Sequence, residues 1–304
     1  APLEKIPLDS KGNLPDIVAI QSESFFDARR LFAGIREDLL PEFDRMTREA
    51  WTAGKLKVPA WGANTVRTEF AFLSGLAEDA LGVHRFNPYR KIALQGISSL
   101  VSILKQLGYR TVCVHPYPAS FYYRETVLPQ LGFDDFIDLR GFGNAERFGP
   151  YVSDRAVAEK VKSLVTGQGK PLFVFGITME NHGPLHWEQV ASGDIERLYT
   201  ELPPSGWDDL TIYLRHLVNA DEMIGTLHTH LGASPREAVM CFFGDHVPIM
   251  PQVYQALDSS EKRTDFFIWT NRSRSGNPIS SNLRQVEELP ALLLQLVGTT
   301  SMVH

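Results

Sequence analysis

Residues 238–248 of the chain read Ala-Val-Met-Cys-Phe-Phe-Gly-Asp-His-Val-Pro, and this stretch decides the fold. Ala238–Gly244 is an almost unbroken apolar run that ends in two ionisable residues, Asp245 and His246. Continuous rather than alternating apolar character is typical of a strand buried on both faces, as in a parallel sheet. A charged Asp directly after such a strand needs a partner if it is even partly buried. The stretch therefore predicts a central strand with a functional group at its carboxyl end.

Further apolar runs with the same character alternate along the chain with helical patterns. The expected strands are Asp16–Ser22, Arg110–His115, Pro171–Met179, Ala238–Gly244 and Asp265–Thr270, and the expected helices are Leu39–Ala53, Gly96–Leu107, Arg124–Leu131, Ser153–Val165, Asp209–Leu231 and Gln285–Leu296. The weakly periodic stretch Trp187–Trp207, which contains Gly and Pro, predicts a long surface loop. Strands that alternate with helices predict an α/β fold with a mostly parallel central sheet and helices on both faces.

Composition limits the classes of protein to which the chain can belong. Its 304 residues are 43% hydrophobic and 22% charged, which favours a folded chain, and we expect one catalytic domain over residues 1–304. The net charge of −6, with no basic stripe, argues against nucleic acid as a partner. No apolar run approaches the length of about 20 residues that crosses a bilayer. Cys113 and Cys241 lie inside strand-like runs and are expected to be buried hydrophobes, not a disulfide.

Residues able to bind a metal or take part in catalysis follow four of the expected strands. Glu23 follows Asp16–Ser22, and His115 ends Arg110–His115. Asn181 and His182 come after Pro171–Met179, and Asp245 and His246 come after Ala238–Gly244. Ligands of open α/β sheets bind outside the carboxyl ends of the strands, so these side chains are expected to meet at one edge of the sheet. A Glu, an Asp and a His supply the oxygen and nitrogen donors that suit Mn²⁺, Zn²⁺ or Mg²⁺.

A candidate nucleophile lies in the segment Trp61-Gly-Ala-Asn-Thr-Val-Arg-Thr-Glu-Phe. Thr65 opens a helical pattern there, which places its oxygen in the positive end of the helix dipole, where an alkoxide or a phosphate is stabilised. The alternative is that Thr65 is an ordinary N-cap, worth about 1 kcal/mol. The residues around Thr65 do not decide between these two interpretations.

Five motifs taken together resemble the extracytoplasmic catalytic domain of the lipoteichoic acid synthase family, a branch of the alkaline phosphatase/sulfatase superfamily. They are Gln21-Ser-Glu-Ser, Gly62-Ala-Asn-Thr-Val-Arg-Thr-Glu-Phe, His115 with Tyr122 and Arg124, Thr178-Met-Glu-Asn-His-Gly-Pro, and Gly244-Asp-His-Val-Pro. The resemblance covers nearly the whole chain. It favours this branch over sulfatases proper, because their Cys-x-Pro-x-Arg motif does not fit Cys113-Val-His-Pro-Tyr.

The resemblance implies a role for each of these residues. Glu23, Thr65, Asp245 and His246 would bind one divalent metal, first of all Mn²⁺, with Mg²⁺ or Zn²⁺ as alternatives. A phosphoglycerol pocket would comprise His115, Tyr122, Arg124, Asn181 and His182, with Tyr122 where the family has a Trp. Thr65 would be the nucleophile, Arg124 and His115 would hold phosphoryl oxygens, and His182 would donate or accept a proton. Without a phosphate to bind, Arg124 would instead pair with Glu125 or Asp134 on a surface helix.

The implied reaction is phosphoglycerol transfer. Thr65 would take glycerol phosphate from the phosphatidylglycerol headgroup and pass it to a cell-envelope glycan or a glycerol-phosphate polymer. A phosphatase or phosphodiesterase with water as acceptor is the first alternative, and a non-catalytic glycan- or lipid-binding domain is the second. The N-terminus, Ala-Pro-Leu-Glu-Lys-Ile-Pro, has no signal-peptide pattern and indicates a mature or truncated start. We expect an extracytoplasmic protein that a missing N-terminal anchor holds at the membrane surface.

Overall fold

The computed structural model describes residues 3–6, 13–91, 93–259, 261–272 and 283–299. Within them, eight strands form one sheet in the order β10-β2-β9-β8-β1-β7-β3-β4. Their bounds are β1 (Asp16–Ser22), β2 (Thr52–Lys57), β3 (Arg110–Val114), β4 (Asp135–Ile137), β7 (Leu172–Ile177), β8 (Ala238–Gly244), β9 (Thr264–Thr270) and β10 (Leu283–Gln285). All neighbours pair in parallel except β9, which is antiparallel to both β8 and β2. The predicted mostly parallel sheet is confirmed.

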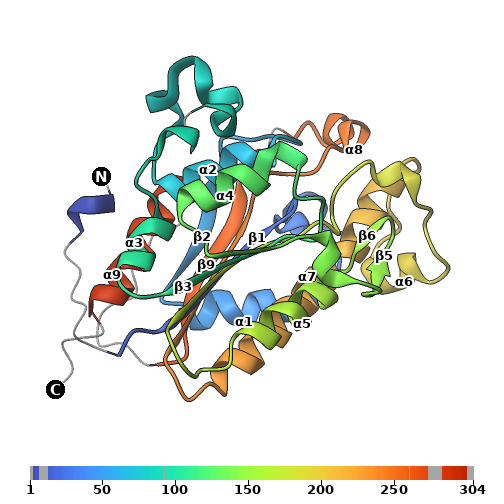
Figure 1. The fold of residues 1–304 in the computed structure, drawn as a ribbon. Helices are drawn as coiled ribbons and strands as arrows, with labels where there is room; N and C mark the ends of the chain where they lie inside the picture. Colours follow the sequence, from blue (N-terminus) through green and yellow to red (C-terminus); the bar gives the residue numbers. More distant parts are fainter. Residues whose placement is uncertain (1–2, 7–12, 92, 260, 273–282, 300–304) are drawn as a thin grey trace.

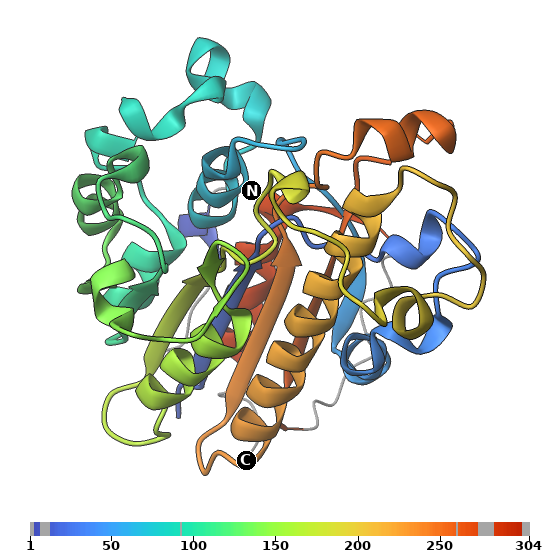
Figure 2. The same ribbon diagram turned by 90° about the vertical axis from the view of Figure 1, so that its right-hand side faces the viewer.

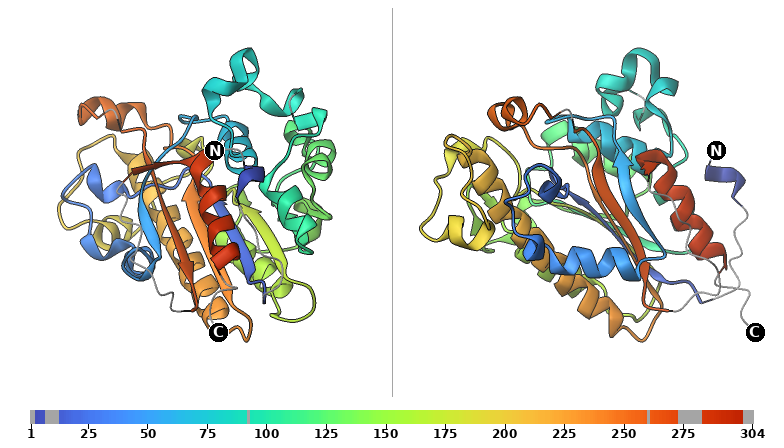
Figure 3. Two further views of the ribbon diagram at one scale, coloured as in Figure 1. Left: turned by 90° about the vertical axis from the view of Figure 1, so that its left-hand side faces the viewer. Right: turned by 180° about the vertical axis from the view of Figure 1, so that it is seen from behind.

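Helices cover both faces of this sheet (Figure 1). One face carries α1 (Pro41–Glu49), α5 (Asp154–Leu164) and α7 (Asp208–Gly232), and Figure 2 looks onto α5 and α7. The other face carries α2 (Thr65–Ser74), α3 (Leu100–Gln106), α4 (Arg124–Leu131) and α9 (Leu289–Thr299). Figure 3 shows α9 and α1 on opposite sides of the strands. This three-layer arrangement is the one that the alternation of strands and helices predicts.

Short elements connect the layers, namely the hairpin β5 (Arg147–Phe148) and β6 (Tyr151–Val152), the helices α6 (Asp194–Leu198) and α8 (Pro251–Ala256), and the 3₁₀ turns η1 (Leu3–Lys5), η2 (Ala28–Arg30), η3 (Glu37–Leu39), η4 (Glu78–Phe86), η5 (Pro88–Arg90), η6 (Ala93–Gln95), η7 (Phe121–Tyr123), η8 (Leu139–Phe142), η9 (Leu185–Trp187) and η10 (Val286–Glu288). In the described part of the chain, no helix has both the length and the apolar character of a membrane span.

The hydrophobic core has two halves, one on each side of the sheet. In β8, Met240 and Phe242 face the half formed with α1, α5 and α7, while Cys241 and Phe243 face the half formed with α2, α3, α4 and α9. Every residue of β8 is buried, which explains why its sequence is continuously apolar. Cys113 is also buried, and both cysteines are free, as predicted.

Several predicted boundaries are wrong, each for a local reason. The expected helix Leu39–Ala53 ends at Glu49, because residues from Thr52 onward pair with β9 as β2. The expected helix Gln285–Leu296 begins only at Leu289, because Pro290 is tolerated only in the first turn of a helix. The expected helix Gly96–Leu107 starts at Leu100, where Ser99 forms a capping box. The expected loop Trp187–Trp207 contains the short helix α6.

Strand register brings the carboxyl ends of β1 and β8 together. Ser22 is the pairing partner of Gly244, so the residues that follow each strand leave the sheet side by side. A Cβ atom on Gly244 would lie 1.8 Å from the backbone oxygen of Phe25. The loop after β1 can therefore cross the end of β8 only because residue 244 has no side chain.

We expect Gly244→Ala to destabilise the chain by about 1–3 kcal/mol, because the backbone at Phe25 must shift to admit a methyl group. Gly232→Ala, at the end of α7, is the matched control, since a Cβ there meets nothing within 4 Å. Thermal unfolding of both variants measures the difference. Equal melting temperatures would show that the Phe25 segment is not held against Gly244.

Candidate active site

Three ionisable side chains meet at the carboxyl ends of β1 and β8. One ligand atom each from Glu23, Asp245 and His246 lies within 4.8 Å of the other two, and all three residues are buried. This is the convergence that the strand-end positions predict. Glu23 comes from the segment after β1, and the adjacent Asp245 and His246 come from the segment after β8.

Two residues to which sequence analysis assigned no role hold this cluster in place. The Oγ of Ser24 donates a hydrogen bond to Glu23 Oε1 (2.9 Å), and its backbone N–H donates to Asp245 Oδ1 (2.8 Å). Ser24 has a φ of 53°, an uncommon conformation for a residue with a side chain. Thr178 Oγ1 accepts from the backbone N–H of Glu23 (3.0 Å). Both residues lie in motifs quoted above, but only tertiary contacts reveal what they do.

The orientation of His246 suits a ligand. Its Nδ1 lies 3.1 Å from the carbonyl oxygen of Val247, and because a carbonyl can only accept, Nδ1 carries the hydrogen. The Nε2 atom therefore faces the carboxylates, at 3.3 Å from Glu23 Oε1 and 3.6 Å from Asp245 Oδ2. In many metal sites a backbone carbonyl binds one nitrogen of a histidine and so orients the other nitrogen toward the metal.

The two buried carboxylates of the cluster give it negative charge that favours the binding of a cation. Neither Glu23 nor Asp245 pairs with a Lys or Arg among the described residues, and Asp245 Oδ2 is buried without a hydrogen-bond partner. Burial and the charge of Glu23 raise the pKa of Asp245 to about 7. Burial alone would lower the pKa of His246, but Asp245 and Glu23 outweigh it and raise that pKa. The donor set of one nitrogen and carboxylate oxygens fits a divalent metal such as Mn²⁺, Mg²⁺ or Zn²⁺.

Thr65 lies beside this cluster, at the first position of α2. The N-cap of the helix is Asn64, so the alternative interpretation of Thr65 as an N-cap is wrong. Its Oγ1 instead lies 3.4 Å from Glu23 Oε2. One turn further, Thr68 Oγ1 donates to the backbone oxygen of Asp245 (2.7 Å), which ties α2 to the segment after β8. The helix thus holds the Thr65 hydroxyl against the candidate metal ligands.

Arg124 is buried and its charge is matched by a residue that sequence analysis missed. Its Nη2 donates to Glu69 Oε2 at 2.6 Å and its Nε to Glu69 Oε1 at 3.1 Å, while the hydroxyl of Tyr89 also donates to Glu69. The pairing with Glu125 or Asp134 on a surface helix does not occur. Arg124, which is expected to hold phosphoryl oxygens, cannot contact phosphate through two nitrogens in this arrangement, because its Nε and Nη2 bind Glu69 and only Nη1 is without a partner.

Tyr122 and Tyr123 lie next to Arg124 in the chain, at the start of α4. Tyr122 packs its ring against the guanidinium group, 5.3 Å from ring centroid to Cζ. Tyr122 and Tyr123 both have positive φ angles, of 54° and 58°, just before α4. Successive strained residues of this kind are concentrated at functional sites. Burial and the charges of Glu23 and Asp245 raise the pKa of Tyr122, against the effect of Arg124, so this ring is within electrostatic reach of the cluster.

His115 has a defined protonation pattern. Its Nδ1 lies 3.1 Å from the carbonyl oxygen of Ile177 and so carries the hydrogen. Burial, together with the charge of Arg124, holds the pKa of His115 well below its usual value, so the ring is neutral. The buried Nε2 is then an acceptor without a partner. It suits a hydroxyl donor better than the phosphoryl oxygen that we expected it to hold.

The adjacent residues Asn181 and His182, after the end of β7, differ in their exposure. Asn181 is buried, and neither atom of its amide has a hydrogen-bond partner in the structure. His182 is exposed, with its ring edge-on to Tyr151 at 5.4 Å between centroids. It lines the cavity that opens beside Glu23. Asn181 is therefore buried at the end of β7, whereas His182 lies at the wall of the cavity.

A second buried acidic cluster lies near the site and was not anticipated. Glu180 binds Nδ1 of His216 (3.1 Å), and the other His216 nitrogen binds Glu188 (2.8 Å). Burial alone would lower the pKa of His216, but the hydrogen bonds to both carboxylates raise it to about 9. Glu180 Oε2 also accepts from the backbone of Asp154. The cluster joins β7 to α5 and α7, which gives it a structural role.

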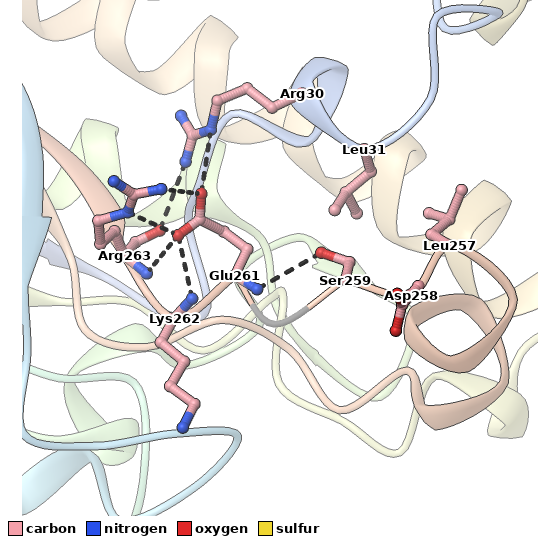
Figure 4. A pocket seen from close by; sticks show the side chains of 8 residues that line it. All are labelled: Arg30, Leu31, Leu257, Asp258, Ser259, Glu261, Lys262 and Arg263. Carbon is pink, nitrogen blue, oxygen red and sulfur yellow. Dashed lines mark hydrogen bonds and ion pairs between the residues drawn. The ribbon is translucent and has the colours of Figure 1, made fainter.

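A hollow of about 510 Å³ beside α8 carries several basic residues (Figure 4). Its arginines are already paired: Arg30 with Asp265 and Glu261, and Arg263 with Glu261. Their charges are therefore balanced inside the hollow. It offers no built site for an anion.

Comparison with known proteins assigns the chain to a family. The sulfatase family model matches residues 15–299, and the chain belongs to that family. It is 34% identical over 257 residues to the capsular polysaccharide biosynthesis protein RkpI of Rhizobium meliloti (strain 1021), which covers 84% of this chain and 45% of that protein. The chain spans less than half the length of the curated relatives it matches.

Solved structures confirm the alkaline phosphatase/sulfatase-like fold. Streptococcus pyogenes phosphoglycerol transferase GacH, in complex with sn-glycerol-1-phosphate, is 24% identical with a TM-score of 0.78, over 99% of this chain and 78% of that one. The C-terminal periplasmic domain of EcEptC from Escherichia coli, in complex with Zn, is 15% identical with a TM-score of 0.70, over 98% of this chain and 86% of that one. At these identities the likeness concerns the fold.

We expect divalent-metal affinity to rise with pH. In the metal-free chain the raised pKa of Asp245, about 7, means that a proton competes with the cation up to neutral pH. Mn²⁺ should bind about tenfold more tightly at pH 8 than at pH 6, as measured by calorimetry. Asp38→Asn, at an exposed carboxylate, should leave binding unchanged, while Asp245→Asn should remove most of it. Equal affinity at the two pH values would contradict a site built on Asp245.

Proposed function

We propose that this chain is the catalytic domain of a metal-dependent phosphoglycerol transferase that resembles lipoteichoic acid synthase. It takes glycerol phosphate from phosphatidylglycerol and passes it to a cell-envelope glycan or a glycerol-phosphate polymer. The observation that carries this proposal is the Thr65 hydroxyl, held 3.4 Å from Glu23 at a helix N-terminus beside a buried Glu-Asp-His cluster. Support also comes from GacH, whose structure with sn-glycerol-1-phosphate has a similar fold.

The proposed reaction has two displacements at phosphorus. Thr65 Oγ1 attacks, the bond from phosphorus to the diacylglycerol oxygen breaks, and a phosphoglyceryl ester of Thr65 forms. The acceptor hydroxyl then displaces Thr65. A divalent ion held by Glu23, Asp245, His246 and Thr65 would favour the alkoxide and offset phosphoryl charge. The N-terminus of α2 contributes a further positive field at Thr65.

The remaining residues bind the headgroup and move protons. Arg124 Nη1, the one donor of the guanidinium group that Glu69 leaves without a partner, is directed to a phosphoryl oxygen. His115 Nε2 accepts from a glycerol hydroxyl, Tyr122 forms a flat wall, and Asn181 supplies an amide. His182, at the entrance, protonates the leaving oxygen and later takes the proton of the acceptor.

The cellular setting follows from the substrate. A phosphatidylglycerol donor requires the domain to work at a membrane surface, and from the resemblance to lipoteichoic acid synthases we infer that this is the extracytoplasmic face and that the full-length protein has an anchor. Residues 1–304 are interpreted as one catalytic domain. The water-accepting phosphodiesterase shares all of these residues and differs only in what attacks the Thr65 ester, so product analysis separates the two.

Replacement of Thr65 tests the nucleophile. Thr65→Ala should lower turnover of phosphatidylglycerol by more than about a thousandfold, because no oxygen is left to attack, while Thr65→Ser should retain measurable activity. Melting temperatures should stay close to that of the wild type, since Thr65 does not cap α2. Diacylglycerol release gives the rate, and mass spectrometry of the Thr65 peptide detects the ester. Wild-type activity in Thr65→Ala would make water the nucleophile.

Replacement of His115 tests the headgroup pocket. His115→Ala should lower kcat/KM for a fluorescent phosphatidylglycerol analogue tenfold or more, about 1.4 kcal/mol per decade, with Mn²⁺ affinity unchanged. His230→Ala is the matched control, because its ring also binds a backbone carbonyl but lies at the far end of α7. Arg124→Ala is a poorer test, since it strands a buried Glu69 charge at a cost of about 3–5 kcal/mol. Unchanged kcat/KM in His115→Ala would place the headgroup elsewhere.

A further inference from the structure

A cavity of about 720 Å³ opens directly beside Glu23 and Ser24. Its walls come from the loop before α2, from residues 182–186, from the start of α7 and from the segment that leads into α8. Figure 2 shows these segments gathered at the carboxyl end of the sheet. The volume is typical of a site for a small molecule or for a few units of a polymer.

The charges in this cavity differ from those of the headgroup pocket. Three carboxylates line it, those of Glu23, Asp208 and Asp209. Its basic lining residues are two histidines, His182 and His186, and none of the described lining residues is a Lys or an Arg. Asp208 is exposed and Asp209 is half-buried, and neither pairs with a basic side chain of Lys or Arg in the described part of the chain. Ionised carboxylates only accept hydrogen bonds. They therefore suit a ligand rich in hydroxyl donors and repel one rich in phosphates.

The rest of the lining is mainly apolar and flat. Pro184, Ile249 and Pro251 contribute to the walls, and the Ile249 side chain is 53% exposed. Apolar walls with a few convergent polar groups are the usual composition of a binding pocket. A sugar ring presents both kinds of surface, because its C–H groups can lie on the apolar wall while its hydroxyls reach the carboxylates.

The cavity reaches the reacting centre from a different side than the proposed headgroup residues do. His115, Tyr122 and Arg124 do not line it, whereas His182 and Glu23 do. In a phosphoryl transfer the attacking and leaving oxygens lie roughly in line. The acceptor must therefore approach the Thr65 ester from the side that the diacylglycerol oxygen has left. Neither diacylglycerol nor a neutral glycan carries a net charge, which matches a cavity whose described lining residues include no Lys or Arg.

We propose that this cavity is the acceptor subsite and that it selects an uncharged glycan over a polyanionic glycerol-phosphate chain. This inference rests on the proposed phosphoglycerol transfer. In the step concerned, a glycan hydroxyl oxygen forms a bond to phosphorus as the bond from phosphorus to Thr65 Oγ1 breaks. The hydroxyl proton passes by way of His182, and Thr65 regains a proton as its hydroxyl is restored, so charge and atoms balance.

The first arm of the test measures binding without turnover. The metal-free chain is titrated by calorimetry with a mixture of neutral linear gluco-oligosaccharides and, separately, with a synthetic glycerol-phosphate hexamer. We expect the neutral sugars to bind and the hexamer not to bind. Asp208→Asn with Asp209→Asn should weaken sugar binding tenfold or more. Glu201→Gln, an exposed carboxylate in the same region but outside the cavity, is the matched control.

The second arm separates this inference from the proposed function. With Mn²⁺ and phosphatidylglycerol vesicles, diacylglycerol release in the absence of acceptor should be equal in the wild type and the double variant, while transfer to the sugar falls tenfold or more in the variant. Absence of diacylglycerol release in the wild type would overturn the proposed function itself. Release together with preferred transfer to the glycerol-phosphate hexamer, or with sugar transfer unaffected by the double variant, would overturn only the glycan subsite. Melting temperatures check that the variants are folded.

Discussion

The parallel register between β1 and β8 is the constraint on which the rest of the site depends. Because Ser22 is level with Gly244, the chain leaves both strands at the same height, and Glu23 emerges next to Asp245 and His246. A shift of one residue would turn every side chain of a strand to the opposite face of the sheet. The two-sided burial of β8 makes such a shift costly. The apolar core therefore fixes the position of the charged cluster above it.

The charges of Glu23, Asp245 and His246 then limit which ligand this cluster can bind. Two buried carboxylates whose one basic partner among the described residues is His246 are unfavourable unless they take up protons or a cation. The pKa of Asp245 is raised in the metal-free chain for this reason. Ser24 limits the cost by hydrogen bonding to both carboxylates. The cluster is therefore a candidate site for a divalent ion. In the proposed reaction, such an ion would give a domain with net charge −6 a local site for an anionic headgroup.

The site has two sides of different character. On one side, Glu69 and Tyr89 hold Arg124 rigidly, and His115 presents a bare acceptor nitrogen. On the other side, the cavity has carboxylates and apolar walls but no Lys or Arg among its described lining residues. A single buried pair, Glu69 with Arg124, therefore limits where phosphate can bind. This division of charge suits a donor that is anionic and an acceptor that is not.

Much of the architecture was accessible from sequence, because burial on both faces leaves a continuous apolar run that is visible in Asp16–Ser22 and Ala238–Gly244. The ionisable residues after these runs were accessible for the same reason, since polar groups at strand ends are exceptions in an apolar context. β2 was missed because Thr52–Lys57 lies nearer the edge of the sheet and is only partly buried, so its sequence has no such run.

Contacts between residues far apart in the chain were decided only by the tertiary structure. Glu69 looks like any helical glutamate, and its pairing with Arg124, 55 residues away, depends on how α2 packs beside α4. The positive φ of Ser24 and the tautomer of His115 depend likewise on neighbours supplied by other strands. Local sequence determined which residues form strands and helices and which side chains can bind a metal or react. Packing decided which of those groups are buried, paired or left with a free atom, because burial and partnership are properties of the assembled fold.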